Sequence, residues 1–232
     1  MALVLGIIPA RGGSKGIPNK NLIKLNGKPL LLYTLDAARN SKKLSDFIIS
    51  TDSETIAECA TKNGLNVTSL RPPELATDTA KSIDVAIYEI EKYELEKGSQ
   101  VDYIAWLQPT APLREAKDID NAFEIIARKE ADSLISVYEA GNIHPNIMYY
   151  LDKNNRLKPV VREGEKMLRR QEFNPVYLRN GAVYIATKKQ VMENRSFVCE
   201  NPVCYIMPLE RSVNIDEPFD LEYAEWMISR HG

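Results

Sequence analysis

Residues 3–22 read Leu3-Val-Leu-Gly-Ile-Ile-Pro-Ala-Arg11-Gly-Gly-Ser-Lys15-Gly-Ile-Pro-Asn-Lys20-Asn-Leu22, an apolar strand that runs directly into a basic, glycine-rich loop. The glycines allow the backbone to approach a ligand closely, and Arg11, Lys15 and Lys20 can neutralise a polyphosphate. The alternative is a solvated loop whose basic residues face water. The density of cations favours a phosphate-binding loop.

Two common phosphate loops do not match this sequence. A Walker loop places Ser or Thr directly after Gly-Lys, whereas here Lys15 precedes Gly16. A dinucleotide fingerprint opens a helix directly, whereas Pro18 and Pro29 delay any helix to about residue 29. The loop is therefore long and irregular, and its length suits a whole nucleoside triphosphate.

Composition restricts the class of protein. The 232 residues suffice for one α/β domain over residues 1–232, with an inserted arm at about 140–180. Lys and Arg total 30 against 32 Asp and Glu, so no global charge favours nucleic acid or membranes as partners. No signal peptide or apolar run of membrane-spanning length is present in the sequence, and we expect a cytoplasmic protein.

Cysteine and histidine contribute little to the expected chemistry. The three cysteines, Cys59, Cys199 and Cys204, lack metal-type spacing, and their odd number argues against a disulfide framework. With only His144 and His231, a histidine-based hydrolase triad or metal site is poorly supported. We therefore expect the chemistry to come from Arg, Lys and Asp.

Apolar runs alternate with helical patterns along most of the chain. The predicted strands cover residues 3–9, 46–50, 65–69, 101–107 and 132–138, with further strands at 182–187 and 203–207. The predicted helices cover residues 29–39, 53–63, 79–97, 117–129 and 217–229. This alternation predicts βαβ units and a mostly parallel sheet with helices on both faces.

The alternation stops between about residues 140 and 180. Pro and Asn residues there separate short apolar runs such as Ile147-Met-Tyr-Tyr-Leu151, which indicates a hairpin-rich arm. Such an arm cannot bury its apolar residues alone, so we expect a homodimer. The alternative is an ordinary long connection, although one of this length is unusual in a compact domain.

Polar residues follow several of the predicted strands, at the edge where an open parallel sheet binds ligands. Ser50-Thr51-Asp52 follows the second strand, where it can simply cap the next helix. Arg71 and Ser82 follow the third and can meet a base or phosphate, while Thr77, Asp78 or Thr79 is expected to cap the long helix.

Two further clusters can hold a second substrate and a metal ion. Gln108 and Thr110 stand in a proline-stiffened turn and can read sugar hydroxyls or amides, unless this is only a turn. Asn214 and Asp216 lie two residues apart on an extended segment, and their oxygens suit Mg²⁺, although Asp216 can also cap the last helix. The basic residues of the arm can match carboxylates or phosphates, or simply face water.

Seven motifs occur in an order that resembles the CMP-sialic acid synthetases, also called acylneuraminate cytidylyltransferases. They are residues 7–21, Ile49-Ser-Thr-Asp-Ser53, Arg71-Pro-Pro-Glu-Leu-Ala-Thr-Asp-Thr79, Leu107-Gln-Pro-Thr-Ala-Pro-Leu-Arg114, Arg169-Arg-Gln171, Asn180-Gly-Ala-Val-Tyr184 and Ser212-Val-Asn-Ile-Asp216. The resemblance covers essentially the whole chain. It implies a Rossmann-like nucleotidyltransferase fold, a homodimer with swapped arms, and Mg²⁺-dependent transfer of CMP from CTP to a nine-carbon (nonulosonic) acid with release of pyrophosphate.

The resemblance also implies roles for individual residues, in three groups. The catalytic and metal-binding group is Arg11, Lys20 and Asp216, with Asn214 as a second metal ligand. The nucleotide-binding group is Ala10, Arg11, Gly12, Gly13, Ser14, Asn21, Arg71 and Ser82. The sugar-binding group is Gln108, Thr110, Arg170 and Tyr184. A general base is not evident from the sequence.

The sequence departs from the family pattern at two positions, which bear on the metal and the sugar. Relatives often carry Asp where this chain has Asn214, and some place an arginine at the position of Leu178, with Arg179 shifted by one. N-acetylneuraminic acid is the first expected substrate, and legionaminic acid or another bacterial nonulosonic acid is the alternative. A cytidylyltransferase for the eight-carbon acid Kdo and a silent nucleotide-binding protein are further alternatives.

Overall fold

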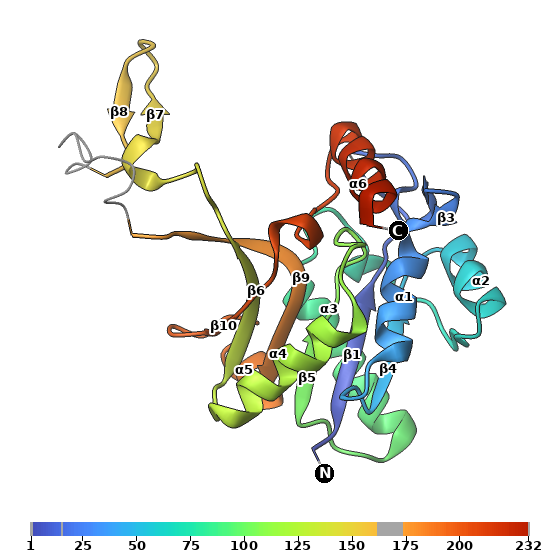
Figure 1. The fold of residues 1–232 in the computed structure, drawn as a ribbon. Coiled ribbons are helices and arrows are strands. Elements are labelled where there is room, and N and C mark those ends of the chain that lie inside the picture. The colour runs from blue at the N-terminus through green and yellow to red at the C-terminus, as the bar shows by residue number, and fades with distance from the viewer. Residues whose placement is uncertain (1, 15, 162–173, 232) are drawn as a thin grey trace.

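The computed structural model describes residues 2–14, 16–161 and 174–231. Its main sheet has six strands, and β1 (Val4–Pro9) is the neighbour of an edge strand. The β1 side chains at 4, 5, 7 and 8 are buried, as expected of a strand covered on both faces. The strand order is β10-β6-β9-β5-β1-β4 (Figure 1). The other strands are β4 (Asp46–Ser50), β5 (Tyr103–Trp106), β6 (Ser133–Glu139), β9 (Tyr177–Thr187) and β10 (Val203–Ile206).

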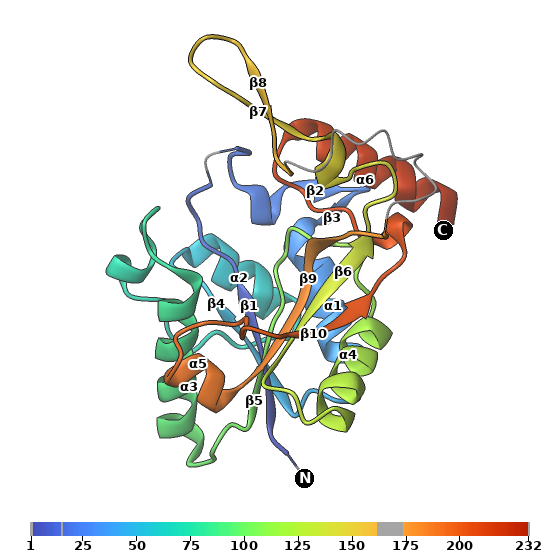
Figure 2. The same cartoon turned by 90° about the vertical axis from the view of Figure 1, so that its left-hand side faces the viewer.

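Helices cover both faces of this sheet (Figure 2). On one face, apolar residues of α1 (Leu30–Asn40), α2 (Glu54–Lys62) and α4 (Ala116–Arg128) join one core cluster. On the other, α3 (Ser82–Lys97) and α5 (Lys188–Met192) join a second. A third cluster lies under α6 (Pro218–His231) and includes Ile17 of the glycine-rich loop and Ile215.

The predicted α/β architecture is confirmed, with one difference in strand direction. The pairs β1–β4, β1–β5 and β6–β10 are parallel, but β9 is antiparallel to both β5 and β6. The chain leaves the sheet at the end of β6 and returns directly beside it, where Glu139 pairs with Tyr177. A strand that returns in this way must run antiparallel.

The predicted strand at residues 65–69 is wrong. Leu65 and Val67 pack against the core cluster, but this segment forms no strand and leaves β4 as the edge of the sheet. The alternation of apolar residues there reflects burial of two side chains without backbone pairing.

The predicted helix caps are wrong as well. The helix α3 begins after Lys81 rather than after Thr77, Asp78 or Thr79, because a turn closed by the Ala80 N–H to the Thr77 oxygen precedes it. The cap of α2 is Ser53, which leaves the Asp52 carboxylate free to accept the Gly12 N–H at 2.9 Å. The Asp52 side chain therefore connects the segment after β4 to the glycine-rich loop by a hydrogen bond.

The predicted arm contains a hairpin that projects from the sheet (Figure 1). Its strands are β7 (Tyr149–Leu151) and β8 (Leu157–Pro159), and it follows a short 3₁₀ helix at Pro145–Ile147. The side chains of Ile147, Tyr150, Leu151 and Leu157 are exposed. Among the helices of the described residues, none is long and apolar enough to cross a membrane.

The remaining elements are short. They are the hairpin β2 (Lys24–Leu25) with β3 (Lys28–Pro29), and the 3₁₀ helices Lys20–Leu22, Pro73–Leu75 and Leu209–Arg211. The first of these helices contains Lys20 and Asn21, and the last precedes the segment that carries Asn214 and Asp216.

Candidate functional site

A cleft of about 440 Å³ opens beyond the carboxyl ends of β1 and β5. Ten of the predicted site residues line it: Arg11, Ser14, Lys20, Asn21, Arg71, Ser82, Gln108, Thr110, Asn214 and Asp216. These residues come from segments far apart in the sequence. The sheet therefore brings the glycine-rich loop, the two predicted substrate-binding regions and the predicted metal ligands into one cavity.

The order of the strands gives the cleft a direction. Arg71 lies at the end of β4, where its backbone N–H donates to the Thr51 oxygen at 2.6 Å. The glycine-rich loop follows the neighbouring β1, and Gln108 follows β5, the next strand. The phosphate loop therefore lies between two regions at the edge of the sheet. The predicted nucleotide-binding region is on its β4 side, and the predicted sugar-binding region is on its β5 side.

The glycine-rich loop is held in place by side chains from its own surroundings. Asn21 is buried and its Nδ2 donates to the Arg11 carbonyl oxygen at 2.9 Å. The Arg11 guanidinium faces the opposite wall, where Nη1 lies 2.9 Å from Asp78 Oδ1. A hydrogen bond therefore holds the Arg11 backbone, and an ion pair holds its guanidinium.

Lys20 connects this loop to the segment that carries Asp216. Its Nζ donates to Asp216 Oδ1 and to the Ile215 carbonyl oxygen, both at 3.0 Å. The lysine side chain is 11% exposed, whereas that of Asp216 is 63% exposed. A Cβ at Gly16 would overlap the Asp216 carbonyl oxygen, so the two segments touch through their backbones.

At the other end of the cleft, three segments meet around Gly181 of β9. Its φ is +71°, and a Cβ there would lie 2.8 Å from Gln108 Oε1 and 3.3 Å from Asn214 Oδ1. The Ile215 N–H donates to the Thr110 carbonyl oxygen at 2.7 Å. The glycine therefore allows both Gln108 and Asn214 to lie close to the β9 backbone.

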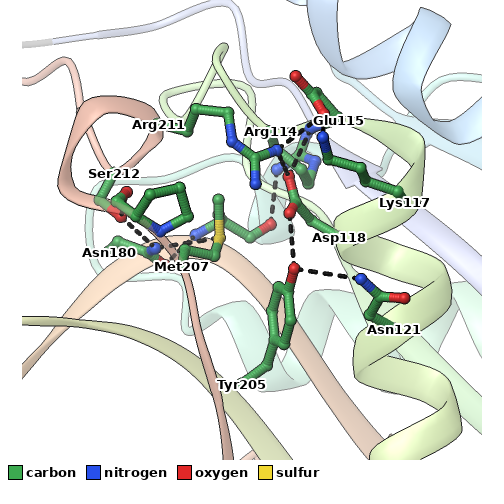
Figure 3. Close-up of polar contacts among 12 residues, drawn as sticks. Arg114, Glu115, Lys117, Asp118, Asn121, Asn180, Tyr205, Met207, Arg211 and Ser212 are labelled. Carbon is green, nitrogen blue, oxygen red and sulfur yellow. Dashed lines mark hydrogen bonds and ion pairs between the residues drawn. The ribbon is translucent and has the colours of Figure 1, made fainter.

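Buried charged and polar groups around Arg114 and Asp118 lie next to this end of the cleft (Figure 3). The Arg114 guanidinium donates to the Gln108 and Ala182 carbonyl oxygens, at 3.2 and 2.6 Å. Burial lowers the pKa of Arg114 to about 9, and the nearby Asp118 opposes that shift. Asp118 accepts from Arg211 Nη1 at 2.7 Å, which fixes the start of the segment leading to Asp216.

Asp216 and Asn214 are the residues that fit a divalent cation. The Asp216 carboxylate is exposed to the cleft, and Asn214 Oδ1 is buried with no hydrogen-bond partner among the described residues. In the described part of the chain no group of three or more His, Cys, Asp or Glu side chains forms a metal site. A cation here would therefore need further oxygen ligands, and phosphates of a bound nucleotide are the usual source.

Several predicted residues do not line the cleft. Ala10 is buried and donates its N–H to the Ser50 oxygen at 2.9 Å. Gly12 and Gly13 are not among the lining residues, although Gly13 is exposed. Tyr184 packs against the second core cluster, and burial raises the pKa of its phenol. Arg170 and Lys15 lie outside the described residues.

The cleft also contains residues that the sequence analysis did not assign to it. Asp78 was expected at most to cap a helix, but it pairs with Arg11, and Trp106 lies in the cleft wall at the end of β5. Asp220 does not line the cleft, but it accepts the backbone N–H groups of Asp216 and Glu217, at 2.9 and 2.8 Å. Its position near the start of the last predicted helix is the one local signal for this role.

Comparison with known proteins identifies the family and the fold. A profile of the cytidylyltransferase family matches residues 5–225. The CMP-N,N'-diacetyllegionaminic acid synthase of Legionella pneumophila is 36% identical over 227 residues, which cover 97% of this chain and 96% of the relative. The N-acylneuraminate cytidylyltransferase of Streptococcus agalactiae serotype V is 35% identical over 90% of this chain and 49% of the relative.

A solved structure shares the fold over the full length of both chains. It is a CMP:2-keto-3-deoxy-manno-octonic acid synthetase in complex with CTP, with a TM-score of 0.73 and 16% sequence identity. At this identity the likeness concerns the fold alone. The profile and the sequence relatives show that the chain belongs to the cytidylyltransferase family and is a nucleotidyltransferase, as the resemblance to CMP-sialic acid synthetases predicts.

Proposed function

We propose that this enzyme transfers CMP from CTP to the anomeric hydroxyl of a nonulosonic acid and releases pyrophosphate. The observation that carries the proposal is the order of groups along the cleft. Arg11 and Lys20 stand between Arg71 at the end of β4 and Gln108 at the end of β5. This order suits a nucleotide and an acceptor that meet at the α-phosphorus.

The proposed roles follow from this order. Asn21, Arg71 and Ser82 hold the nucleoside, and Arg11 and Lys20 neutralise the triphosphate. The acceptor hydroxyl attacks the α-phosphorus and gives up its proton to solvent. The bond between the α-phosphorus and the bridging oxygen breaks, and pyrophosphate leaves with that electron pair. The protein contributes mainly by positioning the two substrates and by stabilising negative charge.

Binding the triphosphate requires an exchange of ion-pair partners. Arg11 is paired with Asp78 and Lys20 with Asp216, and all four residues line the cleft. When phosphate oxygens replace the carboxylates as partners of the two cations, Asp216 Oδ1 becomes available to a metal ion, while Asp216 Oδ2 accepts from Asn214 Nδ2 at 2.5 Å. We propose that Asp216, with Asn214 beside it, holds Mg²⁺, which would neutralise phosphate charge when bound.

The proposed acceptor is a nonulosonic acid, and N-acetylneuraminic acid is the first to test. Gln108 and Thr110 offer hydrogen-bonding groups for its hydroxyl and acylamino substituents. The two relatives named for legionaminic and neuraminic acids are almost equally similar to this chain. A site that hydrogen-bonds a hydroxyl rejects the deoxy analogue strongly, so kcat/KM for N-acetylneuraminic and 9-deoxy legionaminic acids at fixed CTP separates them.

We also propose a homodimer in the cytoplasm. The exposed apolar side chains of the arm hairpin need a partner, because an isolated two-stranded hairpin is marginally stable in water. A second copy of the arm offers a surface of the same kind.

Pyrophosphate release tests the proposed function. The protein is incubated with CTP and Mg²⁺, with and without N-acetylneuraminic, legionaminic or pseudaminic acid, and Kdo is the control acid. We expect release that requires both CTP and one of the nine-carbon acids. CTP binding without release in the presence of any of them would identify a silent nucleotide-binding protein, and release with Kdo alone would identify the eight-carbon sugar as the acceptor.

A further inference from the structure

A buried carboxylate lies behind Arg71, on the side away from the cleft. Glu89 of α3 is 3% exposed, Ser50 at the end of β4 is 1% exposed, and Arg71 is 6% exposed. Ser50 Oγ lies between the other two, 2.5 Å from Glu89 Oε1 and 2.9 Å from Arg71 Nε. The three side chains form a chain of hydrogen bonds that leads from the core to the wall of the cleft.

The chemistry of these groups fixes the direction of each hydrogen bond. An ionised carboxylate only accepts, so the Ser50 hydroxyl donates its proton to Glu89. A lone pair of Ser50 Oγ then faces Arg71 and accepts from Nε. The hydroxyl is therefore held in the one orientation that receives the guanidinium.

Backbone oxygens hold the rest of the guanidinium. Arg71 Nη2 donates to the Ser50 carbonyl oxygen at 2.5 Å, and Nη1 donates to the Leu75 carbonyl oxygen at 3.2 Å. These contacts and the Ser50 hydroxyl use three of the five N–H groups of the guanidinium. Its plane is fixed while Arg71 still lines the cleft.

Stability alone does not account for this arrangement. Burial raises the pKa of Glu89 and lowers the pKa of Arg71, so both charged forms carry a desolvation cost. Lys92 Nζ, 3.9 Å from Glu89 Oε2, offsets only part of the cost at Glu89. Apolar residues of similar volume are often as stabilising as a buried pair of charges. A buried carboxylate that acts on a cleft residue through one hydroxyl is better suited to orientation.

We propose that Glu89 and Ser50 are positioning residues that orient Arg71 toward the nucleoside part of the bound nucleotide. This inference rests on the proposed function only in taking a cytidine nucleotide as the ligand of the cleft. We call the hydrogen-bonded chain of Glu89, Ser50 and Arg71 the relay. Because Arg71 stands at the β4 end, beyond the phosphate loop, the relay acts on the nucleoside and not on the β- and γ-phosphates. Its loss weakens CMP and CTP binding by the same factor.

The test measures the dissociation constants of CMP and CTP by titration calorimetry, without the acceptor acid. Ser50→Ala removes the hydroxyl, and Glu89→Gln removes the charge behind it. Loss of a hydrogen bond to a charged group corresponds to about a tenfold change in affinity or more. We expect Ser50→Ala to raise the dissociation constants of CMP and CTP by about tenfold. We expect Glu89→Gln to raise both dissociation constants by equal factors.

A variant of the same helix serves as the control. Glu94 also lies on α3, and its carboxylate accepts from Lys188 Nζ at 2.8 Å and from the Val101 N–H at 2.7 Å. It is not among the residues that line the cleft. Glu94→Gln should lower the thermal unfolding temperature and leave both dissociation constants unchanged.

A double-mutant cycle separates positioning from general destabilisation. If Ser50 acts through Arg71, the variant Ser50→Ala/Arg71→Ala binds CMP no more weakly than Arg71→Ala alone. Additive effects, or folded Ser50→Ala and Glu89→Gln variants with wild-type affinity, would overturn the relay. Failure of the wild-type protein to bind either nucleotide would instead contradict the proposed function.

Discussion

At the scale of single residues, two ion pairs determine the charge of the cleft. Among the described cations of the phosphate loop, Arg11 pairs with Asp78 and Lys20 pairs with Asp216. These partly exposed pairs contribute little to folding. We infer that the cations serve the transfer of a nucleotidyl group.

Replacing Lys20 with alanine should therefore affect turnover far more than folding. The loss of one group that stabilises transition-state charge costs on the order of a hundredfold in rate. Turnover is measured as pyrophosphate release at saturating CTP, and unfolding in urea gives the stability. Lys24→Ala, an exposed lysine on β2, is the control and should retain full activity. Near-normal turnover of Lys20→Ala would exclude its assignment to the triphosphate.

Asp216 should determine the Mg²⁺ dependence of the reaction. Asp216→Asn keeps the size of the side chain but removes the one anionic ligand proposed for the metal, so the Mg²⁺ concentration for half-maximal activity should rise by about tenfold or more. Asp36→Asn, which removes an ion-pair partner of Lys28, is the charge-matched control. An unchanged Mg²⁺ titration for Asp216→Asn would show that the metal is held elsewhere.

At the scale of elements, the glycine-rich loop and the segment before α6 depend on direct backbone contact. A Cβ at Gly16 would overlap the Asp216 carbonyl oxygen, whereas a Cβ at Gly13 would meet nothing within 4 Å. Gly16→Ala should therefore cost about 1–3 kcal/mol in the free energy of unfolding. Gly13→Ala should leave that free energy within about 0.5 kcal/mol of wild type. Equal stability of the two variants in urea would contradict this contact.

The sequence predicts those elements whose pattern is local. The apolar run of β1 and the periodic face of α3 are visible in the sequence, and so is the basic loop between β1 and α1. The segment at 65–69 shows the limit, because alternating burial of Leu65 and Val67 does not require a strand partner. The antiparallel course of β9 depends on where the arm returns, which no local pattern records.

The site shows the same division between local and distant information. Arg11, Lys20 and Gln108 follow strands, and the rule that ligands bind at carboxyl ends locates them. The meeting of Gly181 with Gln108 and Asn214 joins three distant segments, and the pairing of Arg11 with Asp78 joins two. Such contacts depend on the packed fold, so the sequence alone did not predict them.

At the scale of the whole molecule, the arm is the feature that a monomer leaves unexplained. Tyr149 pairs with Pro159 and Leu151 with Leu157, so one face of the hairpin is apolar, and both leucines are exposed. Burying that face against a second copy removes apolar surface from water, which favours association.

We therefore predict a particle of twice the 26.2 kDa chain mass in sedimentation analysis at micromolar concentration. Leu151→Glu should shift the particle to the monomer mass, because it places a charge in the proposed interface. Leu95→Glu changes an exposed leucine on α3, far from the arm in sequence, and should leave the dimer intact. A wild-type particle of single-chain mass would exclude the dimer.

In the proposed reaction, the cleft joins a cytidine nucleotide to an acidic sugar at the α-phosphorus. The most direct measurement follows CTP labelled with ³²P at that position, incubated with the wild-type protein, Mg²⁺ and a nonulosonic acid. We expect the label to pass into a sugar-linked CMP while unlabelled pyrophosphate accumulates in equal amount. Label found only in free CMP or CDP, with the acid unchanged, would contradict it.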